Sequence, residues 1–392
     1  MEKILFLTSG SPYPLLGARK IRDAQMIHLL SQISEVEILF CGEDAQALQF
    51  ENEHFDYLPE NVTMTSLRPT PQSFFNQTMD RIKPAVTQGY EQSVAAALKA
   101  RAVKGKVLWI SRLRMAQYIP LARVLGYKVV LDEHQVESSM MLTNAFSSPK
   151  HWPEGIRAAQ CAVYEQKFCA ASHVVVTASE IDAYRLQKLA PSIPVHIIPH
   201  AVDEKSYLPA RNLAGNSLLF FGALNYQPNH EGLLWFSHEI LPRLKASLGI
   251  NLPRVVVSGT DAPENISSKL KSFGIETYSD HSSLLSLLCD AAVVFFPLRS
   301  GRGNRINILE AMAAGRAIVS TGKGADGLVL KPTYDISIAE NPDAFTTAII
   351  RLLRDPVLRA EIGEHASNTV QERFDWQACL PLLDKLVRQI RS

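Results

Sequence analysis

The sequence has few cysteines, no long hydrophobic run and almost no net charge. Its five cysteines are scattered along 392 residues and form no Cys-x-x-Cys pair. We therefore expect reduced thiols, as in cytoplasmic proteins, and no zinc site. No segment approaches the roughly 20 apolar residues of a membrane span. A net charge of +1 argues against nucleic acid as a partner. The composition indicates a cytoplasmic globular protein.

Motifs for metals, nucleophiles and dinucleotides are missing or incomplete. The chain has no Asp-x-Asp pair, no His-Glu-x-x-His motif and no Gly-x-Ser-x-Gly turn. These absences favour a metal-independent reaction without a cofactor. Residues 322–327, GKGADG, match a dinucleotide-binding loop literally but precede a β-like segment and a proline. Because that mechanism needs a helix N-terminus facing the pyrophosphate, we interpret the match as a turn-rich loop.

Acidic residues are absent from a long stretch of the first half. Between Glu91 and Asp132 every charged residue is basic: Lys99, Arg101, Lys104, Lys106, Arg112, Arg114, Arg123 and Lys128. One interpretation is an ordinary solvated face. The other is a surface for anionic lipid at the inner face of the membrane, or for a phosphorylated acceptor. Each basic residue near an anionic membrane contributes about 1 kcal/mol.

Short β-rich runs alternate with helical stretches, which indicates parallel βα units. The first series of expected strands is 4–8, 36–40, 107–111, 128–132, 173–177 and 195–198, with helices that include 18–33 and 86–104. The second series is 218–221, 255–258, 275–278, 292–296 and 317–320. The predicted fold class is therefore α/β, with two doubly wound Rossmann-like domains.

The expected domains are residues 1–200 and 201–374, followed by an amphipathic C-terminal helix at 375–392. Residues 199–217 interrupt the strand pattern with proline, glycine and polar residues, and we interpret them as an interdomain linker. Ligands of doubly wound sheets bind outside the carboxyl ends of the strands. Two such domains that face each other would form a ligand-binding cleft.

A glycine-rich loop with two arginines precedes a short apolar helix expected at 304–315. Arg302 and Arg305 are unexpected there, because cations are unfavourable at a helix N-terminus. They make sense if an anion binds at this point. Glycines such as Gly303 permit close backbone approach, helix amides point at the anion, and guanidinium groups bind phosphate.

The single acid of this helix, Glu310, has two interpretations. It has the spacing of a capping box, in which Asn304 or Asn307 caps the helix and Glu310 bonds back to the cap. Alternatively, it accepts hydrogen bonds from ligand hydroxyls one turn into the helix. A phosphate beside a diol suggests the ribose and diphosphate of a nucleotide.

Two candidates in the first half lie next to expected strand ends. His134 lies just past the strand at 128–132, and Gly17 lies just before the helix at 18–33. Polar residues at the carboxyl ends of parallel strands are functional candidates. The alternatives are a histidine satisfied by local hydrogen bonds and a glycine that only makes a turn.

Several segments resemble glycosyltransferases of the GT-B fold, in the retaining family 4 group. They are FFGALNYQPNHEGLLWF at 220–236, AAVVFFPLRSGRGNRINILEAMAAGRAIVST at 291–321 and the closing FDW helix. IPHAVD at 198–203 is similar to that family's PNGVD segment, and DEHQVE at 132–137 to its D-x-HNVE. The resemblance covers nearly the whole chain and is strongest in residues 218–330.

The resemblance implies transfer of a hexose, with retention, from a nucleotide-diphosphate sugar to a glycan or glycolipid. The donor would bind domain 201–374 and the acceptor domain 1–200, and the final helix would pack back on the first domain. Glu310 would hold the ribose, His134 would face the transferred sugar, and Gly17 would let backbone approach the diphosphate. The donor-binding candidates are Glu310, Arg305, Arg302, Gly303, Asn304, Asn225 and Gly222.

The sequence departs from the family pattern at two places. Arg302 stands where the family's Glu-x7-Glu pair has its first glutamate. Ala223 and Glu231 stand where the family usually has an arginine and a lysine. We interpret the arginines of 299–305 as relocated charge compensation. The alternatives are a non-catalytic GT-B partner subunit and a sugar-nucleotide epimerase or phosphorylase.

Overall fold

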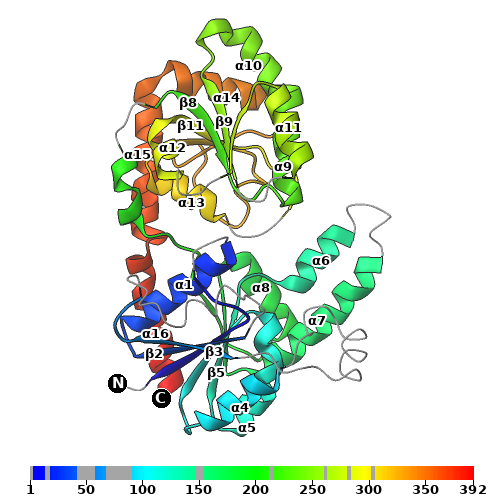
Figure 1. Ribbon diagram of the computed structural model, residues 1–392, viewed down its shortest axis with the longest axis vertical. Helices are drawn as coiled ribbons and strands as arrows, with labels where there is room; N and C mark the ends of the chain where they lie inside the picture. The colour runs from blue at the N-terminus through cyan, green and yellow to red at the C-terminus, as the bar shows by residue number, and fades with distance from the viewer. Residues whose placement is uncertain are drawn as a thin grey trace. The chain divides into compact units, whose positions relative to one another are not determined.

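The computed structural model describes residues 3–13, 18–41, 58–67, 91–145, 153–211, 215–259, 263–279, 284–301 and 305–392. The chain forms two compact units (Figure 1). The first comprises Met1–Pro199 and Cys379–Ser392, and the second comprises His200–Ala378.

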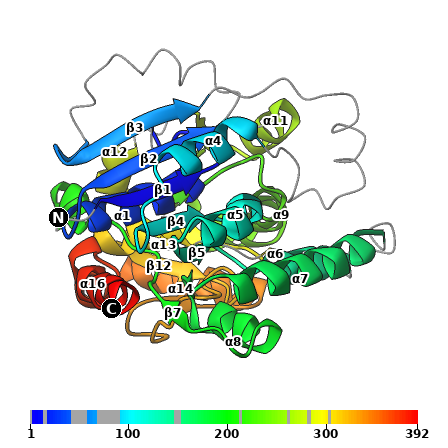
Figure 2. The same cartoon turned by 90° about the horizontal axis from the view of Figure 1, so that it is seen from below.

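The first unit contains a seven-stranded parallel sheet in the order β3-β2-β1-β4-β5-β6-β7 (Figure 2). Its strands are β1 (Ile4–Thr8), β2 (Val36–Cys41), β3 (Val62–Leu67), β4 (Val107–Ser111), β5 (Lys128–Glu133), β6 (Val174–Thr177) and β7 (Val195–Ile197). Its helices are α1 (Ala18–Ser31), α4 (Gln92–Ala100), η3 (Leu113–Tyr118), α5 (Ile119–Val124), α6 (Glu137–Ala145), α7 (Pro153–Ala171) and α8 (Glu180–Leu189). Most of the last helix, α16 (Trp376–Arg391), also belongs to this unit.

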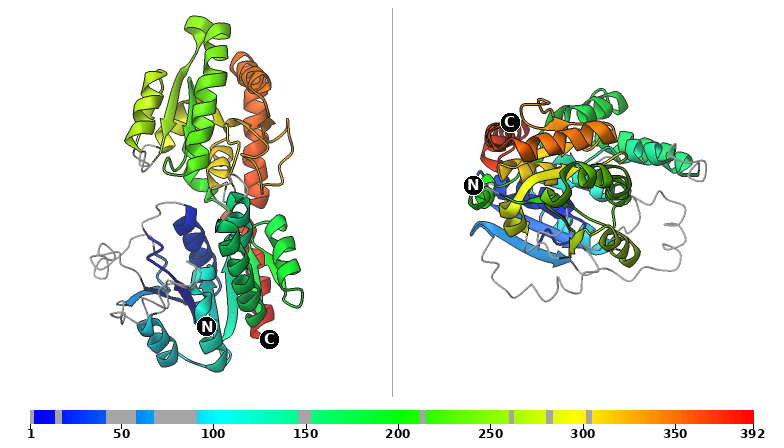
Figure 3. Two further views of the ribbon diagram at one scale, coloured as in Figure 1. Left: turned by 90° about the vertical axis from the view of Figure 1, so that its right-hand side faces the viewer. Right: turned by 90° about the horizontal axis from the view of Figure 1, so that it is seen from above.

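The second unit contains a six-stranded parallel sheet in the order β10-β9-β8-β11-β12-β13. Helices cover both faces of this sheet (Figure 3). Its strands are β8 (Ser217–Phe221), β9 (Arg254–Ser258), β10 (Glu276–Tyr278), β11 (Ala291–Phe296), β12 (Ala317–Ser320) and β13 (Ser337–Ile338). Its helices are η5 (Glu204–Ala210), α9 (Gln227–Trp235), η6 (Phe236–Ile240), α10 (Leu241–Leu248), η7 (Gly249–Asn251), α11 (Glu264–Ser272), α12 (Leu284–Asp290), α13 (Ile306–Ala313), α14 (Pro342–Arg354) and α15 (Pro356–Arg373).

Both sheets are built from apolar strands that are covered on their two faces. Every residue of β1, β4, β8 and β11 is buried, as expected for central parallel strands. In the second unit, Phe236 stacks on Phe295 of β11 with ring centroids 4.1 Å apart. The α/β fold class with two doubly wound sheets is confirmed.

Two local predictions were wrong. Strand β3 was not predicted, because at the edge of its sheet it keeps most side chains partly or fully exposed and its sequence, VTMTSL, is rich in polar residues. The stretch 199–217, interpreted as a linker, contains the 3-10 helix η5 of the second unit. No helix in the described part of the chain is long and apolar enough to cross a membrane.

Candidate functional site

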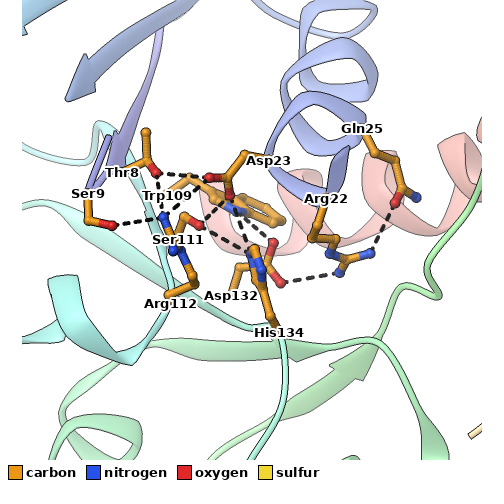
Figure 4. A network of polar contacts seen from close by, with 10 residues as sticks. All are labelled: Thr8, Ser9, Arg22, Asp23, Gln25, Trp109, Ser111, Arg112, Asp132 and His134. Atoms are coloured by element: carbon orange, nitrogen blue, oxygen red, sulfur yellow. Dashed lines mark hydrogen bonds and ion pairs between the residues drawn. The ribbon is translucent and has the colours of Figure 1, made fainter. Parts of the chain in front are cut away.

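Polar side chains gather at the carboxyl ends of three neighbouring strands in the first unit (Figure 4). Thr8 ends β1, Ser111 ends β4, and His134 follows β5, while Asp23 comes from α1. The strand order reverses between β1 and β4. In doubly wound sheets this is the position at which ligands bind.

Asp23 is the centre of this network. Thr8 donates a hydrogen bond to Asp23 Oδ2 at 2.9 Å, and Ser111 donates one to Oδ1. A guanidinium nitrogen of Arg112 lies 3.8 Å from Oδ2. Burial acts most strongly and in the opposite direction, but the contacts with His134, Arg112 and Ser111 together hold the pKa of Asp23 below its usual value. Asp23 is therefore a buried carboxylate at neutral pH.

His134 is 7% exposed, and its two ring nitrogens have different surroundings. Nε2 lies 3.2 Å from Ser111 Oγ and 3.4 Å from Asp23 Oδ1. Nδ1 is buried and has no hydrogen-bond partner among the described residues. Because Asp23 is ionised, we assign a proton to Nε2. Nδ1 is then the atom that remains available to a ligand.

A second buried ion pair, which the sequence did not reveal, fixes α1 against the sheet. Arg22 on α1 donates to Asp132 Oδ1 at 3.2 Å and to the carbonyl oxygen of Pro199 at 2.9 Å. Trp109 donates to the other oxygen of Asp132 at 3.4 Å. Neither charged side chain is exposed. The pair is separated by 110 residues in sequence, so no local pattern could indicate it.

Two further acids are buried in the first unit: Glu133, the residue before His134, and Glu165 on α7. Ser138 donates its backbone N–H to both oxygens of Glu165, at 3.3 and 3.4 Å. Burial raises the pKa of Glu165 to about 7, and burial followed by the charge of Glu165 raises that of Glu133 well above its usual value. Within the described ranges, no group of three or more potential metal ligands is placed to hold an ion.

In the second unit, Arg305 lies at the N-cap position of α13 and is 6% exposed. Its guanidinium donates to the carbonyl oxygen of Lys323 at 2.9 Å, and Nε is buried without a partner. It makes no ion pair with a carboxylate in the part of the chain that the structure describes. Burial lowers the pKa of Arg305, although not enough to discharge a guanidinium. Because buried charges are usually paired, a buried cation of this kind suits an anionic ligand.

The predicted capping box is wrong. Arg305, rather than an asparagine, occupies the N-cap, and its own side chain makes no capping hydrogen bond. Asn307 lies inside the helix, where it donates to the carbonyl oxygen of Phe221 at 3.3 Å. Glu310 does not bond back to the helix start, because Oε1 accepts a hydrogen bond from Tyr207 at 2.7 Å.

Glu310 as a whole residue is partly exposed, but its carboxyl group is buried. Burial raises the pKa of Glu310 to about 7, and the hydrogen bond from Tyr207 acts against this rise. The carboxyl is therefore close to half-ionised at neutral pH. Tyr207, on η5, was missed by the sequence analysis because its stretch was interpreted as a linker.

Gly222 and Asn225 follow β8, the strand beside β11 at the reversal of strand order in the second sheet. Gly222 has φ +154°, and an added Cβ would lie 3.1 Å from Asn229 Nδ2. Asn229 is buried and donates to the carbonyl oxygen of Ala223 at 2.8 Å. Asn225 is exposed on this loop, which the hydrogen bond from Asn229 stabilises. The loop after β8 therefore lies at the expected ligand-binding end of its sheet.

Four predicted site residues lie outside the described residues: Gly17, Arg302, Gly303 and Asn304. Residues 322–327 form consecutive turns, and no helix begins there. The interpretation as a turn-rich loop is confirmed. The backbone carbonyl oxygen of Lys323 in this loop accepts the hydrogen bond from Arg305, so the loop lies next to the candidate donor site.

Comparison with known proteins relates part of the second unit to glycosyltransferases. Residues 215–355 match the family described as Glycosyl transferases group 1. An uncharacterised glycosyltransferase of Methanocaldococcus jannaschii is 32% identical over 92 residues, which span 23% of this chain and 24% of that protein.

The solved structures extend the likeness to the whole fold. Sucrose-phosphate synthase from Thermosynechococcus elongatus matches with a TM-score of 0.74 and 16% identity, over 100% of this chain and 99% of that one. Anabaena HepE in complex with UDP and glucose matches with a TM-score of 0.69 and 13% identity, over 99% of this chain and 100% of that one. The chain therefore has the GT-B fold, and its residues 215–355 match the family described as Glycosyl transferases group 1.

Proposed function

We propose that the chain transfers a hexose from a nucleotide-diphosphate sugar to a glycan or glycolipid, with retention of configuration. The observation that carries the proposal is Arg305, a buried guanidinium without a carboxylate partner among the described residues, at the start of α13 in the group 1 domain. Helix amides and a guanidinium at one point form a site for a phosphate group. HepE, which was solved with UDP and glucose, supports this class of donor.

In this proposal the second unit binds the nucleotide and the first unit provides His134. Arg305 would neutralise the diphosphate, with Arg302 as a further candidate, and Glu310 would hold the ribose. Gly222, Gly303, Asn304 and Asn225 would line the donor, and Gly17 would approach the diphosphate. The leaving diphosphate would take up the acceptor proton, without a metal. The protein would then act mainly by positioning reactants and stabilising charge.

Two alternatives remain distinguishable by experiment. A non-catalytic partner subunit would bind a nucleoside diphosphate but turn over no donor. An epimerase or phosphorylase would convert the sugar nucleotide without a glycosyl acceptor. The test is release of free nucleoside diphosphate from a panel of sugar nucleotides, with and without cell-derived glycan or glycolipid acceptors. Release that depends on the acceptor supports a transferase, and its absence with every donor and acceptor contradicts the proposal.

We also propose a contact between the first unit and anionic membrane lipid. Gly105 donates a backbone hydrogen bond to Gly126 at 2.9 Å, so the turns before β4 and β5 lie side by side. Val103 is 61% exposed and Val124 86% exposed on or beside these turns. Together with Lys104, Lys106, Arg123 and Lys128 they form what we call the amino-edge patch. Exposed apolar side chains among basic ones suit an anionic bilayer surface.

The position of this patch separates it from the candidate site. The patch lies at the amino ends of β4 and β5, whereas Ser111 and His134 lie at their carboxyl ends. Five residues of strand β4 separate the two edges by about 16 Å. The patch therefore suits attachment to a membrane better than direct binding of the acceptor group.

Reversing two charges in the patch tests the membrane contact. Lys104→Glu with Lys106→Glu is expected to weaken binding to phosphatidylserine vesicles by about thirtyfold or more at low salt. The difference should shrink as salt is added, because the attraction is screened. Sedimentation with vesicles measures it, and Lys269→Glu with Lys271→Glu on α11 is the matched control. If the parent protein binds neutral and anionic vesicles equally, the membrane proposal is wrong.

A further inference from the structure

Tyr207 makes the one hydrogen bond that the described residues offer to the Glu310 carboxyl. Its hydroxyl donates to Oε1 at 2.7 Å from helix η5, which lies 103 residues earlier in the chain. Oε2 has no hydrogen-bond partner in the described part of the chain. One oxygen of the carboxylate is therefore fixed by the protein, and the other is free to accept from a ligand.

Helix η5 is anchored on both sides of Tyr207. Asp203 caps its first turn, and the backbone N–H of Glu204 donates to Asp375 Oδ2 at 3.0 Å. At its other end, Arg211 forms an ion pair with Glu204 at 2.6 Å and donates to the carbonyl oxygen of Ala313, the last residue of α13, at 2.9 Å. Tyr207 is thus held against α13 by contacts that do not involve its own hydroxyl.

We propose that Tyr207 is a positioning residue for the donor, whose hydroxyl fixes the Glu310 carboxylate so that Oε2 accepts a ribose hydroxyl. The inference rests on the proposed function, because it requires a nucleotide at Glu310. A free carboxylate can rotate about its last bond, and holding one oxygen removes that freedom before the ligand arrives. Pre-organisation of this kind lowers the cost of binding.

The protonation states support this role. Burial, followed by the neighbouring Glu310 and Asp203, raises the pKa of the Tyr207 phenol far above its usual range, so Tyr207 remains a donor at every pH of interest. The charged groups on η5 near it are Asp203 and the Glu204–Arg211 pair. On α13 the charged neighbours in sequence are Arg305 and Glu310 itself.

The direction of the pH dependence follows from Glu310. The pKa of Glu310 is about 7 in the free protein, so below pH 7 most of the carboxyl is protonated. It must then lose this proton before it can accept hydrogen bonds from the ribose hydroxyls. Affinity for a ribonucleotide should therefore rise with pH up to about 7 and then level off. Between pH 6 and pH 8 the expected rise is about tenfold. Removing the Tyr207 hydrogen bond, which favours the ionised form, should move this midpoint upward.

The experiment is calorimetric titration of Tyr207→Phe with UDP from pH 6 to pH 9. We expect affinity three- to tenfold weaker at pH 7, a midpoint about one pH unit higher, and a smaller difference above pH 8. The phosphate of UDP titrates equally in both proteins, so the ratio of parent to variant affinity isolates the protein group. Glu310→Gln should show no such midpoint. Tyr278→Phe removes a hydroxyl elsewhere in the second unit and should match the parent.

The outcomes separate this inference from the proposed function. If the parent binds UDP and Tyr207→Phe has the same affinity and midpoint, Tyr207 does not position the carboxylate, although the donor site stands. A lower melting temperature with an unchanged midpoint would assign Tyr207 a structural role and also overturn the inference. If the parent binds UDP, GDP, ADP and TDP no better than their free bases, the donor site itself is wrong.

Discussion

Replacement of Arg305 by alanine is expected to weaken nucleoside diphosphate binding by about ten- to a hundredfold. A hydrogen bond to a charged group contributes about 1.5–3 kcal/mol, and each 1.4 kcal/mol is a factor of ten in affinity. Binding of the nucleoside without phosphates should hardly change, because Arg305 is expected to contact only the diphosphate. Calorimetric titration of the variant with a nucleoside and its diphosphate, in parallel, measures both effects.

The structure provides a matched control in the same loop. Arg299 is exposed and lies over the ring of Trp235, with its guanidinium carbon 5.5 Å from the ring centroid. Arg299→Ala removes the same charge from the same segment without emptying a buried site. A large loss of affinity in Arg305→Ala and a small one in Arg299→Ala would identify a specific phosphate contact. Equal losses would indicate a general effect of charge instead.

The stability of the empty Arg305→Ala protein provides an independent check. A cation at the positive end of a helix is repelled, and its burial costs free energy that the charge of Asp326 offsets only in part, because the pKa of Arg305 is still lowered. The hydrogen bond to Lys323 is lost in the variant, but it leaves only a carbonyl oxygen to be solvated. The melting temperature should therefore equal or slightly exceed that of the parent. A marked fall would mean that Arg305 mainly supports the loop.

Strand periodicity was sufficient to predict the sheets because parallel strands covered on both faces are apolar throughout. Expected strands 4–8, 107–111 and 317–320 coincide with β1, β4 and β12. The same principle explains the failures at the sheet edges. Strands β3 and β13, which were not predicted, lie at outer positions of their sheets, where one side of the strand is unpaired and polar residues are tolerated. The other two edge strands, β7 and β10, were predicted, so the edge position makes a strand harder to predict without hiding it.

The candidate site was predictable only where a residue directly follows a strand or directly precedes a helix. His134 follows β5, and Arg305 precedes α13, so the strand–loop–helix order alone indicated both. Asp23 contacts His134 and Tyr207 contacts Glu310, each from a helix far away in sequence, and their roles depend on tertiary packing. The capping box failed for a related reason. Spacing indicates which side chains can reach one another, but Glu310 is instead engaged by a residue outside the helix.

The last expected result concerns turnover. His134→Ala should lower the rate of nucleoside diphosphate release by about ten- to a hundredfold while changing affinity for the nucleotide less than twofold. The proposed role of His134 is to hydrogen-bond the transferred sugar through Nδ1, and loss of a bond that strengthens in the transition state lowers kcat. The measurement is steady-state release from the sugar nucleotide that the parent turns over, alongside nucleotide binding by calorimetry.

Asp23→Asn tests whether the charge of Asp23, rather than its size, is needed for turnover. The amide preserves the size of the carboxylate but removes the charge that fixes the proton on His134 Nε2. Asp23 is thus a positioning residue, and its replacement should change the pH profile of kcat as well as its value, because the Asp23 carboxyl, whose pKa is held below its usual value, no longer titrates. Ser9→Ala is the control, since Ser9 contacts Arg112 at 2.8 Å but neither Asp23 nor His134.

These variants distinguish positioning of a sugar from ordinary structural packing. If His134 only fills the end of β5, His134→Ala should lower the melting temperature and leave turnover of the folded fraction normal. If it binds the nucleotide instead, affinity should fall while bound donor turns over at the parent rate. Only a loss of kcat with intact nucleotide affinity, shared by Asp23→Asn with an altered pH profile, supports the proposed arrangement around Nδ1. The network then matters for function because it leaves one buried nitrogen of His134 unpartnered among the described residues.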